Sequence, residues 1–137
     1  MNYYAVIDTN VIVSALLKEG SIPWQILDLV VEEKIIPVFN KEIMAEYEEV
    51  LIRNKFGFSP AKIKMTLSLI EDFGREMDPV EIQEKFIHED DANFFKIAMS
   101  SRILDETYLV TGNIKNFPER DFVVTPSQIL EIINNNC

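Results

Sequence analysis

Residues 6–10 read Val6-Ile7-Asp8-Thr9-Asn10, and this short stretch decides the predicted fold. It closes an apolar run, residues 3–7, whose length and composition predict a β-strand buried on both faces. A helical pattern of apolar residues follows over residues 10–17. Asp8 is therefore expected at the C-terminal end of a central parallel strand, where open α/β sheets bind their ligands. A buried carboxylate needs a partner, and a metal ion is a natural one.

Strand and helix patterns alternate along the rest of the chain. Further strands are predicted at residues 35–39, 107–111 and 122–124, and a short one around Val80 in the irregular stretch 75–89. Helices are predicted at residues 21–33, 41–53, 60–73, 91–102 and 126–133 from their periodicity and from capping residues. The helix from 41 is expected to be capped by Asn40, the helix to 73 to be ended by Gly74, and the last helix to begin with a capping box of Thr125 and Gln128. Strands separated by helices predict a parallel sheet with helices on both faces. We expect residues 1–137 to form one domain.

The composition narrows the class of protein. Hydrophobic residues make up 47% of the chain, yet no apolar run approaches the roughly 18 residues of a membrane span. No signal peptide is recognisable, and Cys137, the single cysteine, cannot form an internal disulfide, so we expect a cytoplasmic protein. The net charge of −10 argues against broad electrostatic binding of nucleic acid. It leaves open an enzyme whose metal ions contact the phosphates.

Two helices offer acidic side chains that can join Asp8 at one site. In helix 41–53, Glu46 and Glu48 flank the apolar stripe on its two sides, and the spacing does not decide between them. Asp91 precedes three apolar residues, Phe94, Phe95 and Ala98, at helical spacing, so it is aligned with the buried face of helix 91–102. The simpler alternative is that Asp90 or Asp91 caps this helix.

The strand at 107–111 contributes a further candidate ligand. It ends in Val110-Thr111-Gly112-Asn113, where the glycine permits a sharp turn or a close approach to a ligand. Asn113 offers an amide oxygen at the same edge of the sheet, although a turn asparagine is the alternative. His88 is the single histidine, which argues against the usual zinc sites. With four glycines in all, no phosphate-binding glycine loop can be drawn.

Taken in order, these motifs resemble the PIN-domain family. The nearest likeness is to its single-domain prokaryotic members, the VapC-like group of toxin components of toxin–antitoxin pairs. The matching stretches are Val6 to Leu16, Lys41 to Leu51 with its acid at Glu46, Asp90 to Ala98 with its acid at Asp91, Leu109 to Asn113, and Thr125-Pro126. The likeness therefore covers nearly the whole chain.

The resemblance implies a Rossmann-like three-layer α/β/α sandwich with a central, mostly parallel sheet. It also implies a magnesium- or manganese-dependent endoribonuclease that cleaves RNA, forms a homodimer and is held inactive by a cognate antitoxin. The residues that it assigns are the catalytic metal ligands Asp8, Glu46 and Asp91, with a further ligand at Asn113. Thr9, Asn10 and Thr111 are candidates to orient these ligands or a water, and the alternative is that they only cap helices or form turns. One or two ions would be bound.

Asn113 departs from the family pattern, which commonly has aspartate at this position. A neutral ligand lowers the negative charge of the site by one and weakens metal binding there. The alternative function is therefore a catalytically weak PIN-like module that binds RNA or a protein. A haloacid-dehalogenase-like phosphatase needs a second acid where Asn10 stands, and a receiver domain needs paired acids after the first strand, so both fit poorly.

Basic residues that could steer RNA are few. The densest cluster consists of Arg53, Lys55, Lys62 and Lys64, and two more basic residues, Lys115 and Arg120, lie near the expected active edge. Solvated surface charge is the alternative role for all of them.

Overall fold

The computed structural model describes residues 2–82 and 89–136, without the side chains of residues 89 and 90. His88 and Cys137 therefore lie outside the described residues. Within these ranges the sheet has five strands in the order β3-β2-β1-β4-β5, and every pairing is parallel. The strands are β1 (Tyr3–Ile7), β2 (Ile35–Phe39), β3 (Arg75–Glu76), β4 (Thr107–Val110) and β5 (Val123–Val124).

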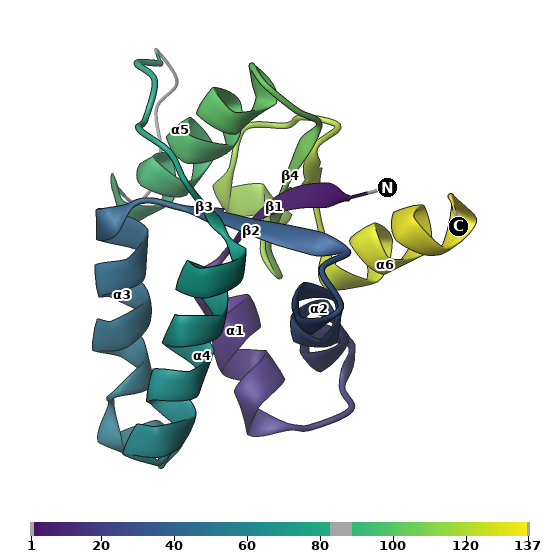
Figure 1. Cartoon of the computed structure of the whole chain (residues 1–137). Coiled ribbons are helices and arrows are strands. Elements are labelled where there is room, and N and C mark those ends of the chain that lie inside the picture. Colours follow the sequence, from purple (N-terminus) through teal and green to yellow (C-terminus); the bar gives the residue numbers. More distant parts are fainter. Residues whose placement is uncertain (1, 83–88, 137) are drawn as a thin grey trace.

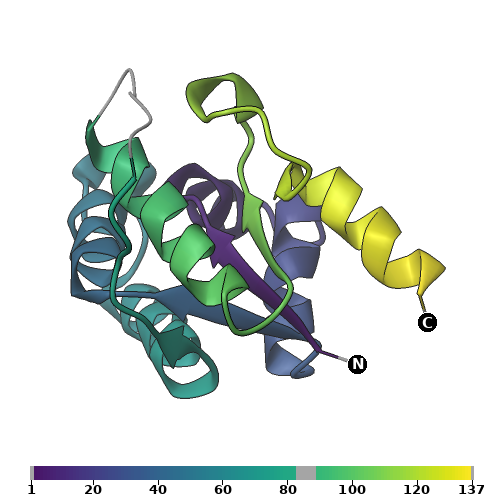
Figure 2. The same ribbon diagram turned by 90° about the horizontal axis from the view of Figure 1, so that it is seen from above.

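The helices cover both faces of this sheet. They are α1 (Thr9–Leu17), α2 (Ile22–Val31), α3 (Lys41–Leu51), α4 (Pro60–Phe73), α5 (Glu89–Arg102) and α6 (Pro126–Asn135). Figure 1 shows α5 on one face of the sheet and α1, α2 and α4 on the other. Figure 2 shows α5 lying across the strands, and α5 contacts β1, β2 and β4. The predicted three-layer α/β/α sandwich is confirmed. Two short 3₁₀ turns, η1 (Asn54–Phe56) and η2 (Ile114–Asn116), were not predicted.

The strand order places a topological switch between β1 and β4. The chain moves outward from β1 through β2 to β3, then returns to add β4 and β5 on the opposite side of β1. Ile7 is in register with Val110, and the Asp8 amide donates a hydrogen bond to the Val110 carbonyl over 2.9 Å. The C-terminal ends of β1 and β4 therefore meet at the position where sheets of this type bind ligands.

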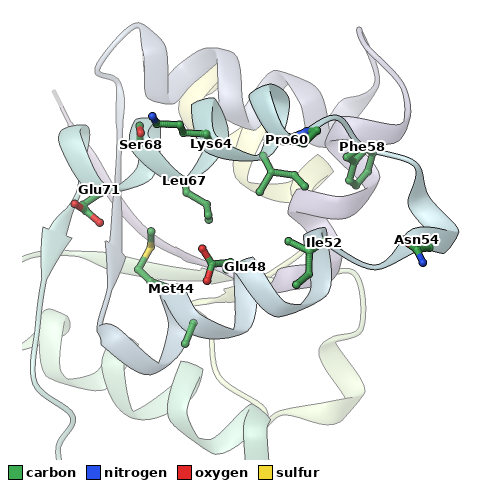
Figure 3. Close-up of a pocket in the computed structure, with 12 residues that line it drawn as sticks. Met44, Glu48, Ile52, Asn54, Phe58, Pro60, Lys64, Leu67, Ser68 and Glu71 are labelled. Atoms are coloured by element: carbon green, nitrogen blue, oxygen red, sulfur yellow. The ribbon is translucent and has the colours of Figure 1, made fainter.

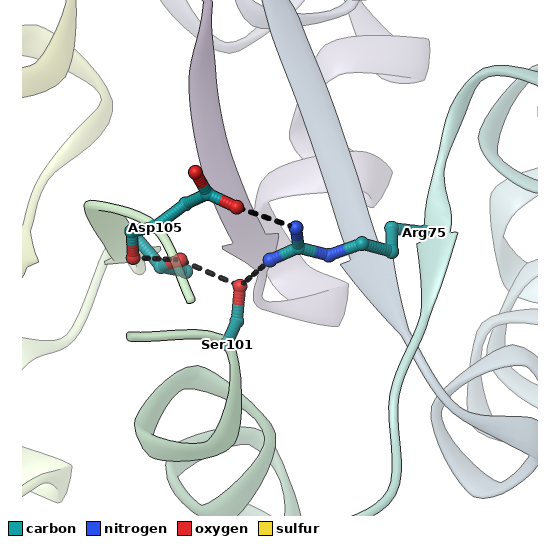
Figure 4. Close-up of polar contacts among 4 residues, drawn as sticks. Arg75, Ser101 and Asp105 are labelled. Atoms are coloured by element: carbon teal, nitrogen blue, oxygen red, sulfur yellow. Dashed lines mark hydrogen bonds and ion pairs between the residues drawn. The ribbon is translucent and has the colours of Figure 1, made fainter. Parts of the chain in front are cut away.

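The predicted strand around Val80 is wrong. The third strand is Arg75–Glu76, which pairs with Val38 and Phe39 of β2. The guanidinium of Arg75 donates hydrogen bonds to the Asp105 carboxylate, over 2.8 Å, and to the Ser101 hydroxyl (Figure 4). An arginine that is anchored by polar partners has no apolar pattern, so hydrophobic periodicity could not locate this strand.

Gly74 ends α4 as predicted, but not because of a left-handed backbone conformation. Its φ is −99°, which any residue can adopt. What excludes a side chain is space, because a Cβ at this position would lie 2.3 Å from the Ile70 carbonyl oxygen and 2.5 Å from the Pro37 carbonyl oxygen. The end of α4 thus packs directly against the backbone of β2.

We therefore expect Gly74→Ala to lower the free energy of unfolding by about 3 kcal/mol, because two backbone atoms would have to move. Urea denaturation followed by circular dichroism measures the change. The matched control is Gly112→Ala, whose added Cβ meets no atom within 4 Å. Equal unfolding midpoints for the two variants would show that the close packing at Gly74 does not determine the stability of the protein.

Candidate active site

A cleft of about 930 Å³ opens where the C-terminal end of β1 meets α3 and α5. Asp8, Glu46 and Asp91 all line it, although they lie far apart in the sequence. The structure thus brings the three predicted acids to one cavity at the switch point of the sheet. Their roles as metal ligands stay predictions.

Asp8 is held by the ends of two neighbouring strands. It follows β1 and begins α1, and its side chain is half-buried. The hydroxyl of Thr111, directly after β4, donates a hydrogen bond to Asp8 Oδ2 over 2.7 Å. Burial raises the pKa of the Asp8 carboxyl above its usual value, while Thr111 and the amides of Asn10 and Thr9 lower it to a smaller extent. The folded protein therefore holds Asp8 in a place that disfavours its charge, and a nearby cation would relieve this.

Glu46 is positioned by the buried stripe of α3. Ile43, Tyr47 and Leu51 of this helix are buried, and the Tyr47 hydroxyl donates a hydrogen bond to the Ile7 carbonyl, one residue before Asp8. Burial and the charges of Asp8 and Glu46 raise the pKa of the Tyr47 hydroxyl well above its usual value, so it stays protonated. Next to Tyr47, Glu46 accepts a hydrogen bond from the Thr9 hydroxyl. Thr9 thus orients Glu46 in the cleft.

The structure also separates Glu46 from Glu48, which the sequence could not. Glu48 faces a different cavity, a groove of about 770 Å³ between α3 and α4, together with Met44 and Leu67 (Figure 3). Glu48 is exposed, whereas Glu46 is half-buried in the cleft with Asp8. Only Glu46 of the two can share a ligand with Asp8 and Asp91.

Asp91 comes from the first turn of α5, where one of its carboxylate oxygens, Oδ2, is shielded from solvent. Two residues later, Asn93 exchanges a pair of hydrogen bonds, each 3.1 Å, with Asn40 at the start of α3. Asn40 Oδ1 also accepts a hydrogen bond from the Ile43 amide over 2.9 Å, as the predicted cap of α3. This amide pair joins α3 to α5 and so fixes Glu46 relative to Asp91. Sequence reasoning missed it because nothing in the chain links two asparagines 53 positions apart.

Asn113 does not belong to the described lining of the cleft, whereas Asn116 does. Asn113 is exposed at the start of η2, and its backbone amide donates to the Thr111 hydroxyl over 3.0 Å. Thr111 is therefore the link between this loop and Asp8. The turn η2, which was not predicted, directs the chain back toward the cleft, so that Asn116 lines it. Asn10, predicted as a supporting residue, is exposed and lines the cleft as well.

The basic residues divide between different surfaces. Arg53 and Lys55 line the cleft, as does Lys96 of α5, which sequence analysis did not single out. The other candidates lie elsewhere. Lys64 lines the groove between α3 and α4, Lys62 lies over the ring of Phe58, and Arg120 lies over the ring of Phe95. Lys115 is exposed on η2 and is not among the described residues that line the cleft.

The donor set suits a hard divalent ion. Within residues 2–82 and 91–136, no group of three or more His, Cys, Asp or Glu side chains is arranged to hold a metal ion by itself. The described ionisable ligands in the cleft are carboxylates, and neither histidine nor cysteine is among them. Magnesium and manganese prefer oxygen ligands, and magnesium keeps several waters while binding one or two carboxylates rather than a closed protein cage. Such an ion fits carboxylates that share a roomy cleft.

Over the described residues, no helix has the length and apolar character needed to cross a membrane.

Comparison with known proteins gives a consistent result. The family model described as PIN domain matches residues 4–115. The uncharacterized protein MJ1680 of Methanocaldococcus jannaschii is 32% identical over 112 residues, which cover 79% of this chain and 69% of that protein. No solved structure matches the chain significantly.

Proposed function

The chain belongs to the PIN-domain family, whose members are generally nucleases, and on that premise we propose that it is a divalent-metal-dependent endoribonuclease. The observation that carries the proposal is the single cleft at the sheet's switch point, lined by Asp8, Glu46 and Asp91. These residues would hold Mg²⁺ or Mn²⁺, and such an ion lowers the pKa of a water and offsets the charge of a phosphate. The proposed reaction is hydrolysis of RNA phosphodiester bonds.

The residues around these carboxylates would keep them in place. Thr111 orients Asp8, and Thr9 orients Glu46, each through one hydroxyl hydrogen bond. Ligands that are fixed by neighbouring hydrogen bonds bind metal more tightly than mobile ones. Asn10 lies at the mouth of the same cleft, where its amide can position a water or a phosphate oxygen.

The proposal extends to the biological setting. The resemblance to VapC-like proteins supports a toxin component that acts in the cytoplasm as a homodimer and is bound by a cognate antitoxin. The net charge of −10 supports a partner with a basic segment, because charge complementarity favours such pairs.

The deciding experiment is cleavage of single-stranded RNA by the purified chain with Mg²⁺, with Mn²⁺, and with EDTA added in excess. We expect cleavage with either metal and none with EDTA. Metal-independent cleavage would refute the proposed chemistry. Saturable binding of RNA without cleavage under any of these conditions would favour the second candidate, a PIN-like binding module. In its favour, no three of the described acidic side chains are arranged to hold a metal ion by themselves.

The position of Asn116 leads to a prediction about metal affinity. We expect Asn116→Asp to tighten Mn²⁺ binding about tenfold, because it adds a carboxylate to the cleft, and metal affinity rises with the ligand charge. Isothermal titration with Mn²⁺ measures this. Asn113→Asp is the matched control, since that side chain is not among the described lining residues, and its effect is expected to stay within about twofold. A larger gain from Asn113→Asp would place the missing family acid at Asn113 instead.

A further inference from the structure

One end of the cleft carries a small aromatic and cationic site. Arg53, Lys55 and Phe56 line the cleft there, and the Phe56 ring stacks on Phe58 with centroids 5.6 Å apart and an interplanar angle of 15°. Lys55 Nζ lies 5.1 Å from the centroid of the Phe56 ring. Phe56 is half-buried, and both cations are exposed. A flat apolar surface and two positive charges thus adjoin the space that holds the carboxylates.

The connection between α3 and α4 builds this site. Figure 1 shows that the connection lies at the end of these helices away from the sheet. Residues Asn54–Phe56 form η1, and Gly57 ends it with φ 67°, a conformation that favours glycine. This turn allows Phe56 and Phe58 to stack although they are only two residues apart. Phe58 also packs under Lys62, whose Nζ lies 5.8 Å from the ring centroid. The stacking contact with Phe58 thus holds the Phe56 ring in place.

The charges of the cleft explain why an aromatic contact matters here. The acidic lining residues are Asp8, Glu42, Glu46, Glu49 and Asp91, against the basic residues Arg53, Lys55 and Lys96. Apart from any bound ion, most of the cleft repels phosphate. A nucleic acid that enters it gains little from electrostatic attraction, so affinity has to come from other contacts. Stacking of bases on aromatic rings is such a contact and does not depend on sequence.

We propose that Phe56 stacks an unpaired base of a single-stranded RNA substrate, while Arg53 and Lys55 contact the adjoining phosphates. The inference rests on the proposed function and adds to it the residues that bind a base and its phosphates. Paired RNA keeps its bases in the helix stack and offers none to Phe56. Leu51, the last residue of α3, lies five residues beyond Glu46, or roughly 7.5 Å along the helix, and Phe56 lies further on. The stacked base therefore belongs to a neighbouring nucleotide rather than to the cleaved bond, and its loss raises KM more than it lowers kcat.

Binding can be measured apart from cleavage by using Asp8→Asn protein in Mg²⁺. The probe is fluorescein-labelled oligouridylate of about twelve nucleotides, followed by anisotropy. Phe56→Leu is expected to weaken binding about 10- to 100-fold, and Phe56→Trp is expected to restore it. With two phosphate contacts on a single strand, the logarithm of affinity should fall with the logarithm of salt concentration with a slope of about −1.4. Phe73→Leu is the matched control, since Phe73 is 40% exposed on α4 and is not among the described residues lining the cleft.

An abasic oligomer tests the contact directly. One abasic residue is moved along the strand, one position at a time. At one position it should lower the affinity of the Asp8→Asn protein by the same factor as the Phe56→Leu substitution does. The protein that also carries Phe56→Leu should bind this abasic strand and the intact strand with equal affinity. Equal binding by Phe56→Leu and its parent, tighter binding of an RNA duplex than of the single strand, or no saturable binding at millimolar oligomer overturns the inference.

The two proposals fail in different ways. Cleavage of RNA by the wild-type chain, with no effect of Phe56→Leu on KM, removes the stacking site and leaves the nuclease. Phe56-dependent binding by a wild-type chain that cleaves nothing leaves the stacking site and removes the nuclease.

Discussion

The Asp8→Asn protein is expected to cleave RNA at least about 1,000-fold more slowly than the wild type, which corresponds to a loss of ~4 kcal/mol of transition-state stabilisation. Asparagine keeps an oxygen that accepts the hydrogen bond from Thr111, but it removes the charge that would hold the ion. Asp91→Asn is expected to give a loss of similar size, because its carboxylate lines the same cleft. Initial rates of cleavage of a labelled RNA with saturating Mn²⁺ measure both.

Measuring the stability of the Asp8→Asn protein distinguishes a loss of catalysis from a loss of folded protein. Burial raises the pKa of Asp8, so at neutral pH its ionised form is less favourable in the folded than in the unfolded chain. Removing the charge should therefore leave the free energy of unfolding unchanged or slightly higher. Asp28→Asn, which changes an exposed acid on α2, is the control and should keep full activity. A loss of activity matched by a loss of thermal stability would assign Asp8 a structural role.

The parts of the fold that the sequence predicts best are those that apolar patterns and caps define. Strand β1 is a wholly apolar run, and Asp8 follows it directly, so the end of the strand and the first candidate ligand could be read together. The capping box at Thr125 and Gln128 likewise marked the start of α6. Each of these signals lies within a few neighbouring residues, so no knowledge of distant contacts is needed.

The parts that the sequence could not predict depend on contacts between distant residues. Strand β3 is anchored by Arg75 and its polar partners, Ser101 and Asp105, rather than by an apolar run. The pairing of Asn40 with Asn93 exists only once α3 and α5 are packed together. Helical spacing also could not rank Glu46 above Glu48, because both flank the buried stripe of α3 and only the positions of α1, α4 and α5 distinguish its two sides.

This last point gives a second prediction of large effect. Glu46→Gln is expected to lower the rate of RNA cleavage about 100- to 1,000-fold, whereas Glu48→Gln, two residues away on the same helix, should change it less than twofold. Both substitutions remove one negative charge from α3, so they alter the net charge and the helix equally. They differ in the cavity that the side chain faces, the cleft for Glu46 and the groove beside α4 for Glu48.

The pair therefore tests position rather than charge. Glutamine at position 46 keeps an oxygen to accept the hydrogen bond from Thr9, so its geometry can persist while its affinity for a cation falls. Titration of each variant with Mn²⁺ should show weaker metal binding for Glu46→Gln alone. At low Mn²⁺ concentration, the loss of cleavage activity of this variant should match its loss of metal affinity. If the two variants lose activity equally, the effect arises from the overall charge of α3. The cleft that joins Asp8, Glu46 and Asp91 would then not be where RNA is cleaved.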